Sequence, residues 1–358
     1  MTEAEQSREA LRHNAGNAAT GGIWRVSGVA GAGGVAGAGG SRILKVAKPP
    51  SGETPAGSAW HTSDTPTHFN YWRREALAYE TGFADSLYRD AGIRAPRLES
   101  QVTRDDGGIE LWLEDVEGPS GFAFSVARLG QFGHELGLGQ ARWAGHVPAR
   151  DELAWLSRGW LRQYLSEGPG NNVHVRDEDW DDPVAHVWPA EVRQRLRSLW
   201  ERRMAALKQV EQLPRTLCHL DCWPANLIED SAGTSVLLDW AFVGEGAVGE
   251  DPANLIIDSV SDGLMDAALL PEIVEAVTAG YIKGLADGGR RGSSDEVRQA
   301  IAVCAVTKYS WLGAHAISTA VRGRARKPAY NEDGSAAETL ARIAGLVELL
   351  ADWVSVLD

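Results

Sequence analysis

The pattern of hydrophobic and polar positions changes along the chain from short extended runs to helical periodicity. Short apolar or alternating runs between turn-forming residues predict strands, and these runs cover 23–26, 41–47, 97–102, 109–113 and 236–238. Apolar residues that recur every three to four positions predict helices, and these patterns cover 2–12, 71–81, 124–140, 151–167, 189–212, 271–286, 295–320 and 335–356. We therefore expect an α+β fold, with a small sheet-rich lobe followed by a larger helical lobe.

The change of pattern also predicts where the lobes join. It occurs near Glu114 to Gly118, which gives an N-terminal lobe of residues 1–116 and a C-terminal lobe of residues 117–358. Two segments interrupt the first lobe. Residues 28–40 are rich in glycine, with Val-Ala-Gly-Ala-Gly-Gly occurring twice, and residues 49–70 are rich in Pro, Ser, Thr and Gly. Both compositions are typical of loops.

Composition and charge exclude several classes of protein. The 358 residues are 44% hydrophobic, which is typical of a globular protein. Lys and Arg number 35 against 49 Asp and Glu, a net charge of −14 that disfavours nucleic acid as a partner. No apolar run reaches the roughly 18 residues of a membrane span, and the first residues lack an apolar signal core. We expect a cytoplasmic protein without a membrane partner.

Acidic residues are concentrated in one stretch, and the cysteines are few. Residues 216–282 hold twelve Asp and Glu and no Lys or Arg, which suits a divalent metal and a cationic small molecule. For more than half of these acids, a solvated helix face is the favoured interpretation. The three cysteines, Cys218, Cys222 and Cys304, are interpreted as small buried hydrophobes rather than as zinc ligands.

The residues with the clearest chemical meaning lie in an H-x-D-x-x-x-x-N string. It contains His219, Asp221 and Asn226, and Asp239 follows thirteen residues later, directly after an apolar strand. Phosphoryl transfer needs a carboxylate that deprotonates the attacking hydroxyl, and an amide oxygen and a second carboxylate that hold magnesium against the phosphates. The alternative is a turn in which Asp221 and Asn226 only cap backbone groups.

With this string the sequence resembles the aminoglycoside phosphotransferase family, which includes choline-kinase-like enzymes and has a protein-kinase-like fold. The resemblance covers about residues 43–252. It implies that Asp221 is the catalytic base, that Asn226 and Asp239 bind Mg²⁺, and that His219 supports the loop. Asp239 is expected to point into the cleft between the lobes as an unpaired acid.

The first lobe carries matching residues for the nucleotide. Lys45 resembles the family's phosphate-binding lysine, with Lys48 as the alternative, and Glu75 resembles the helix glutamate that pairs with it. The segment that includes Glu114 and Val116 resembles the connection between the lobes, whose backbone would bind adenine. Ordinary surface residues and a plain strand end are the alternatives.

Three features depart from the family pattern. Lys45 and Glu75 are 30 residues apart, which the loop 49–70 can absorb. Gly249-Glu250-Asp251-Pro252 resembles the family's Gly-Asp-Pro motif but comes later, after a longer loop. The tract 28–40 stands where kinases fold a loop over the phosphates, but it holds no strict G-x-G-x-x-G. A surface loop is favoured, and a phosphate-cradling loop is the alternative.

These observations predict an ATP- and Mg²⁺-dependent kinase that phosphorylates a hydroxyl of a small molecule. The favoured acceptor is an aminoglycoside-like or other sugar-containing antibiotic, and the alternatives are an amino sugar, an amino alcohol or another metabolite. Trp223 and Trp240 flank the proposed base and metal ligand, and core packing is favoured over stacking on a ligand for both. A protein kinase is disfavoured because no Ala-Pro-Glu segment follows Asp239. A non-catalytic nucleotide-binding scaffold is the alternative from another class.

Overall fold

The N-terminal part of the chain forms one five-stranded antiparallel sheet. The computed structural model describes residues 7–29, 40–50, 59–149, 152–290, 292–323 and 335–358. Across the sheet, the strands are β1 (Ser7–Ala10), β2 (Thr20–Val29), β3 (Gly40–Ala47), β6 (Ile109–Glu114) and β5 (Leu98–Thr103). Successive side chains of β6 alternate between buried and half-buried positions, as expected for a strand that packs on a core through one face.

The prediction of a helix over residues 2–12 is wrong for the part that the structure describes. Residues 7–10 form the edge strand β1, which pairs with β2 from Ser7 opposite Ser27 to Ala10 opposite Trp24. All four residues are exposed, so the segment buries no apolar face that would hold a helix against the core. Residues 2–6 lie outside the described part.

Two small sheets lie within the remaining chain. One contains β4 (Ile93–Arg94), β10 (Ser235–Leu237) and β9 (Leu227–Glu229), and the other contains β7 (Ser157–Arg158), β11 (Gly244–Ala247) and β8 (Arg215–Cys218). Because β4 pairs with β10, a strand from before the expected lobe junction joins a sheet formed mainly by later residues. The lobe boundary at residue 116 stays a prediction.

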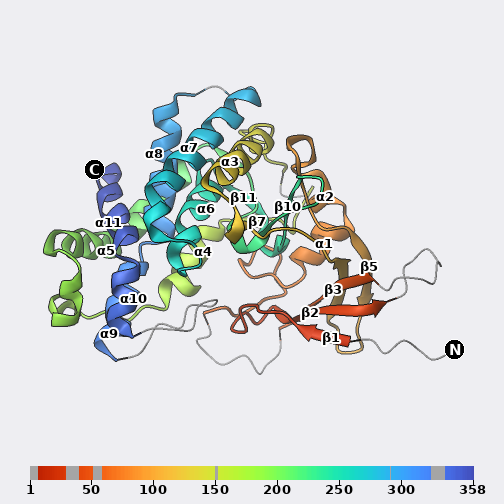
Figure 1. The fold of residues 1–358 in the computed structure, drawn as a ribbon, viewed down its shortest axis with the longest axis horizontal. Coiled ribbons are helices and arrows are strands. Elements are labelled where there is room, and N and C mark those ends of the chain that lie inside the picture. Colours follow the sequence, from red (N-terminus) through yellow and green to blue (C-terminus); the bar gives the residue numbers. More distant parts are fainter. Residues whose placement is uncertain (1–6, 30–39, 51–58, 150–151, 291, 324–334) are drawn as a thin grey trace.

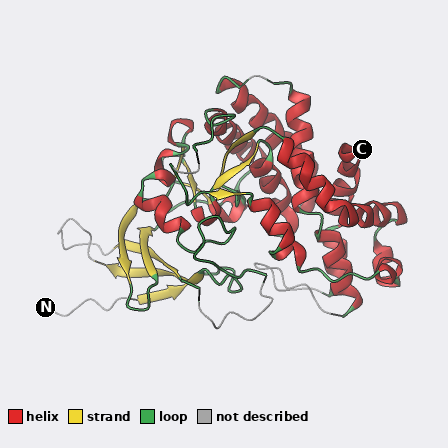
Figure 2. Cartoon of the chain, turned by 180° about the vertical axis from the view of Figure 1, so that it is seen from behind, coloured by secondary structure: helices red, strands yellow, loops and turns green. Residues whose placement is uncertain are grey.

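Helices form most of the remaining structure, and Figures 1 and 2 show most of them gathered away from the five-stranded sheet, whereas the first helix along the chain lies next to it. The helices are α1 (Arg74–Glu80), α2 (Phe83–Ser86), α3 (Val126–Ala141), α4 (Trp160–Ser166), α5 (Ala190–Gln212), α6 (Glu250–Ser261), α7 (Leu270–Asp287), α8 (Ser294–Lys308), α9 (Leu312–Val321), α10 (Ala336–Arg342) and α11 (Ala344–Trp353). The expected α+β architecture, sheet-rich first and helical later, is confirmed.

Several helix predictions need correction. The pattern at 151–167 gives a helix only from Trp160, because Gly159 takes a left-handed backbone (φ 80°) directly before it. The patterns at 295–320 and 335–356 each contain two helices. Helix α6 has no predicted counterpart. Eleven of its twelve residues are buried, and its polar side chains, such as Asn254, bond to other parts of the protein instead of facing solvent.

Helices α3 and α7 pack unusually closely through glycine. A Cβ atom added at Gly284 would lie 2.0 Å from the carbonyl oxygen of His134, and one added at Gly280 would lie 2.0 Å from that of Gly130. The two backbones are therefore in direct contact. In the described part of the chain, no helix is long and apolar enough to cross a membrane. The three cysteines are buried and free, as predicted.

Candidate active site

The string from His219 to Asn226 follows strand β8, and Asp251 of α6 holds its first backbone amides in place. The carboxylate of Asp251 accepts hydrogen bonds from the amides of His219 and Leu220, each at 2.8 Å. Leu220 has a left-handed backbone (φ 68°), which is uncommon for a residue with a bulky side chain. The longer loop that precedes Asp251 contains β11, which pairs with β8 and so brings the start of α6 beneath the string.

Asp221 and Asn226 are in direct contact. The amide nitrogen Nδ2 of Asn226 donates to the backbone carbonyl and to Oδ2 of Asp221, both at 2.8 Å. Since both hydrogens of this nitrogen are used, the Oδ1 of Asn226 is free to accept a ligand, and no described residue donates to it. The side chain of Asn226 thus fixes Asp221 and offers an oxygen at the same time.

Lys45, Glu75 and Asp239 form one ion-paired cluster. The ammonium of Lys45 lies 2.7 Å from Oε2 of Glu75 and 2.8 Å from Oδ1 of Asp239. The 30-residue separation between Lys45 and Glu75 therefore does not prevent their contact. The expectation that Asp239 is unpaired is wrong. Lys48, the alternative to Lys45, is exposed and does not line the same cavity.

Burial and neighbouring charges change the acidity of this cluster. Burial lowers the pKa of Lys45, but the charges of Asp239 and Glu75 outweigh it and raise the pKa above its ordinary value. Burial raises the pKa of Glu75 to about 7 despite the opposing charge of Lys45. For Asp239, the nearby Lys45 outweighs burial and lowers the pKa. Asp239 therefore stays ionised, as a cation ligand must be.

Asp221 and His219 respond differently to burial. Burial raises the pKa of Asp221 to about 7, the negative charge of Asp239 adds to this rise, and the charge of Lys308 opposes it. Such a carboxylate can take up a proton near neutral pH, which is the property of a general base. Burial lowers the pKa of His219 to about 4, and its ring lies edge-on to Trp240 at 5.0 Å. His219 is thus a neutral packing residue behind the string.

Arg74, which the sequence analysis did not single out, binds backbone carbonyls next to the cluster of Lys45, Glu75 and Asp239. It is fully buried, and its guanidinium donates to five backbone carbonyls, those of Pro66, Phe69, His68, Trp155 and Ala241. Burial without a carboxylate partner lowers its pKa to about 9. Arg74 precedes Glu75 and binds the carbonyl two residues after Asp239, so it ties the two acids of the cluster to each other.

Glu114 and Val116 lie at the end of β6. The Glu114 carboxylate binds Arg94 at 2.9 and 3.1 Å and accepts from the amide of Arg97 at 3.0 Å. The Glu114 amide donates to the carbonyl of Arg97 at 2.9 Å. The carboxylate and the amide of Glu114 are therefore engaged within the protein, while Glu114 and Val116 both line the neighbouring cleft.

A single cleft of about 750 Å³ brings most of the candidates together. The candidate residues that line it are Lys45, Glu75, Glu114, Val116, Asp221, Asn226 and Asp239. His219 is buried behind the string and does not line it. Trp240 is fully buried, as the core interpretation predicted, whereas Trp223 is half-buried and lines the cleft.

The segment 11–19, between β1 and β2, lines one side of this cleft. It is anchored by the bond from Asn70 Nδ2 to Asn17 Oδ1 at 2.8 Å. Residues 30–39 of the glycine tract lie outside the described part, so its function as a surface loop or a phosphate-cradling loop stays a prediction. The strands that flank the tract pair at Val29 opposite Gly40, and Lys45 pairs with Ile23 further along the same strands.

Acidic and aromatic side chains also line this cleft. Asp258 lies near enough to Asp221 for its charge to add to the rise that burial causes in the pKa of Asp221. The Asp258 carboxylate is fixed by the side chains of Asn254 at 2.5 Å, Tyr309 at 2.6 Å and Ser261 at 3.1 Å. The lining residues that sequence reasoning missed include Trp60, Tyr164, Asp258, Asp262 and Trp311. Asp258 and Asp262 fall in the acidic stretch 216–282, which is the one signal that could have identified them.

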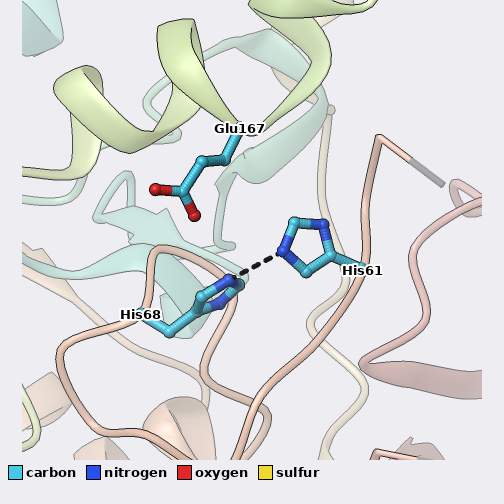
Figure 3. A group of neighbouring side chains, drawn as sticks. All are labelled: His61, His68 and Glu167. Atoms are coloured by element: carbon cyan, nitrogen blue, oxygen red, sulfur yellow. Dashed lines mark hydrogen bonds between the residues drawn. The ribbon is translucent and has the colours of Figure 1, made fainter. Parts of the chain in front are cut away.

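A second group of potential metal ligands lies nearby, formed by His61, His68 and Glu167 (Figure 3). The Nε2 atoms of the two histidines are 3.0 Å apart. The Asn70 amide donates to Nδ1 of His68 at 3.1 Å, which leaves the proton of neutral His68 on Nε2, facing His61. A metal at this Nε2 would displace that proton, so the arrangement is a hydrogen-bonded pair that closes the loop 61–70.

Comparisons with known proteins give a family match and a similar fold. Residues 37–292 match the model of the phosphotransferase enzyme family. No curated protein sequence matches significantly. An amicoumacin kinase bound to AMP-PNP and Ca²⁺ has a similar fold, with a TM-score of 0.50 and 12% identity over 96% of this chain and 88% of that chain.

Two further solved structures are more distant in shape. An aminoglycoside phosphotransferase from Streptomyces rimosus has a TM-score of 0.43 and 17% identity over 84% of this chain and 92% of its own. An ethanolamine kinase from Plasmodium vivax has a TM-score of 0.47 and 11% identity over 96% and 81%.

Proposed function

Because the chain belongs to the phosphotransferase enzyme family, we propose that it transfers the γ-phosphate of ATP to a hydroxyl of an amine-bearing small molecule. Enzymes of this family are small-molecule kinases that use ATP with a divalent metal. The observation that carries the proposal is the single cleft that Asp221 shares with the Lys45–Glu75–Asp239 cluster. A base and a phosphate-binding cation are the two protein groups that this reaction needs.

The residues divide the reaction between them. The Lys45 ammonium binds ATP phosphate oxygens, and Glu75 holds it in place. The Glu114 carbonyl and the Val116 amide bind the adenine edge. As the acceptor oxygen attacks the γ-phosphorus, Asp221 accepts the hydroxyl proton and the bond to ADP breaks. His219 packs behind this loop and keeps it in place.

The oxygens of Asn226 and Asp239 fit a magnesium ion. Asn226 Oδ1 accepts from no described residue, and Asp239 binds Lys45 through Oδ1, which leaves Oδ2 for a cation. Magnesium prefers one or two carboxylate or amide oxygens together with phosphate oxygens and water. When bound, the ion supplies positive charge that neutralises the phosphates.

The end of the cleft beside Asp221 supports an amine-bearing acceptor. Asp258 is held in one orientation by three hydrogen bonds, and Asp262 lines the same cleft. The aromatic rings of Trp311, Tyr164 and Trp60 line it too, and such rings suit the apolar faces of sugars and the charge of ammonium groups. An aminoglycoside-like or other sugar-containing antibiotic fits this chemistry, as does an amino sugar or an amino alcohol.

The proposal is tested by measuring ATP consumption with Mg²⁺ across aminoglycosides, other sugar antibiotics, amino sugars and amino alcohols. Each active acceptor is then compared with its N-acetylated form, which lacks the positive charge. We expect turnover with amine-bearing acceptors and loss of it on acetylation. Asp221→Asn is the control, and its kcat should fall about 10²- to 10⁴-fold while ATP affinity is kept.

A non-catalytic nucleotide-binding scaffold is the competing function. It predicts tight ATP binding and no turnover with any acceptor. The charged cluster of Lys45, Glu75 and Asp239 argues against it, since a protein that only binds nucleotide has no need of a second carboxylate and a base in the same cleft.

A further inference from the structure

Lys308, the last residue of α8, is a buried cation behind the catalytic string. Its side chain is 6% exposed, and it does not line the cleft. The ammonium donates to Oδ1 of Asn254 at 2.6 Å and to the carbonyl of Leu220 at 3.5 Å. It also lies over the ring of Trp160, 4.9 Å from the ring centre. The ammonium is thus held from three sides by groups that carry no negative charge.

This arrangement is costly for the folded state. Within the described residues, no carboxylate oxygen lies within 4.0 Å of the Lys308 ammonium. A buried ammonium without an ion pair loses its hydration and gains no direct ionic contact in return. An apolar side chain of similar volume is often at least as stable in such a site. The charges of Asp221, Glu250 and Asp251 attract the ammonium only from beyond ion-pair distance, so a direct ion pair does not explain a lysine at this position.

Lys308 contacts the peptide group that joins Leu220 to Asp221. It binds the carbonyl of Leu220, the residue directly before Asp221, whose backbone is left-handed. Asp251 holds the amide of the same residue from the other side. The peptide groups on both sides of Leu220 are therefore fixed by charged side chains from α6 and α8. A strained backbone of this kind persists only where its surroundings hold it in place.

We propose that Lys308 is a positioning residue for phosphoryl transfer, which holds the Leu220 carbonyl so that Asp221 points at the acceptor hydroxyl. Through Asn254, the same ammonium is linked to Asp258 at the acceptor end of the cleft. Lys308 thus sets the orientation of both the base and the acceptor-binding acid without touching either substrate. The inference rests on the proposed function.

The test compares Lys308→Met with the wild type in phosphoryl transfer to an active acceptor and in slow ATP hydrolysis, where water is the acceptor. We expect kcat to fall at least about tenfold for both, because small displacements of a base are costly. The KM for ATP should stay within about twofold, because Lys308 does not reach the cleft, whereas the KM for the acceptor should rise, because Asn254 and with it Asp258 lose a contact. The melting temperature should stay the same or rise. Lys308→Arg should recover part of kcat, since it keeps the charge.

Two matched controls isolate the effect. Thr307→Val changes the buried neighbour on α8, and Lys283→Met removes an exposed lysine on α7, and neither should change kcat. An unchanged kcat in Lys308→Met, or a loss of kcat explained entirely by unfolded protein, overturns the inference and leaves the proposed function standing. A wild type that transfers phosphate neither to an acceptor nor to water overturns the proposed function itself, and this inference with it.

Discussion

At the scale of single residues, Asp239 forms an ion pair with Lys45 and is the proposed carboxylate ligand of magnesium. Asp239→Asn should abolish turnover and remove the dependence of ATP binding on magnesium. It should also lower the stability by about 1 kcal/mol, because Lys45 keeps Glu75 as a partner and Asp239 is a third exposed to solvent. Titration calorimetry of ATP with and without magnesium, together with thermal melts, measures both effects. Equal ATP binding by wild type and variant in both conditions would exclude Asp239 as the metal ligand.

His68 gives a second prediction at this scale, on acid stability. Burial, and to a lesser extent His61, lowers its pKa to about 4 in the folded protein, against an ordinary value of 6.5. Its contribution to stability is complete above pH 6.5 and is lost as the pH falls towards 4, since the unfolded chain binds the proton first. His68→Gln should therefore lose less melting temperature between pH 7.5 and pH 4.5 than the wild type. An identical loss in both proteins would contradict this.

Residues close together on the chain could be predicted from their spacing, and Lys45 and Glu75 through the family resemblance, but a tertiary contact outside that resemblance could not be predicted. Asp221 and Asn226 lie on one turn, and Asp239 follows a strand, so their spacing alone indicated their proximity. Lys308 comes 88 residues after Leu220, whose carbonyl it binds, and nothing in its own neighbourhood marks it. Their contact depends on how α8 packs on α6, which no local pattern contains.

At the scale of elements, the contact between α3 and α7 leaves no room for a side chain at the glycines where the two helices meet. Gly284→Ala should destabilise the protein by about 1–3 kcal/mol, because its Cβ atom would meet the backbone of His134 and the helices would have to separate. Gly345→Ala is the matched control, since its Cβ in α11 meets no atom within 4 Å. It should be neutral or slightly stabilising, by up to about 1 kcal/mol. Chemical denaturation measures both. A tolerated Gly284→Ala would mean that the helices can move apart freely.

Long helices with a solvent-exposed polar face were predicted, whereas a buried helix and a short exposed strand were missed. Helices α3, α5 and α7 alternate between core and solvent and were found close to their true bounds. Helix α6 is almost wholly buried and uses its polar side chains for contacts inside the protein, and β1 is a strand of four exposed residues. Both matter for the site, because α6 supplies Asp251 and β1 begins the hairpin whose connecting segment lines the cleft.

At the scale of the whole molecule, we expect the KM for ATP to respond differently to changes in two connecting segments, 30–39 between β2 and β3 and 11–19 between β1 and β2. Removing six residues from 30–39 should leave this KM unchanged, because loop length costs little free energy and the flanking pair of Val29 and Gly40 lies at the other end of the strands from Lys45. Asn17→Ala should raise that KM about fivefold, the effect of one lost hydrogen bond, because it releases the segment 11–19. Steady-state kinetics decides between them. A tenfold rise on shortening the tract would make it a phosphate clamp.

The five carbonyls bound by Arg74 have a consequence for the thermodynamics of nucleotide binding. They fix the chain before Asn70, the residue Trp155 and the turn after Asp239 around one guanidinium, next to Glu75. The cluster of Lys45, Glu75 and Asp239 is therefore already ordered in the protein without nucleotide, and ATP binding does not require it to become more ordered. Calorimetry should accordingly find a heat capacity change of ATP binding that the buried nucleotide surface accounts for alone, with no further contribution from a folding segment.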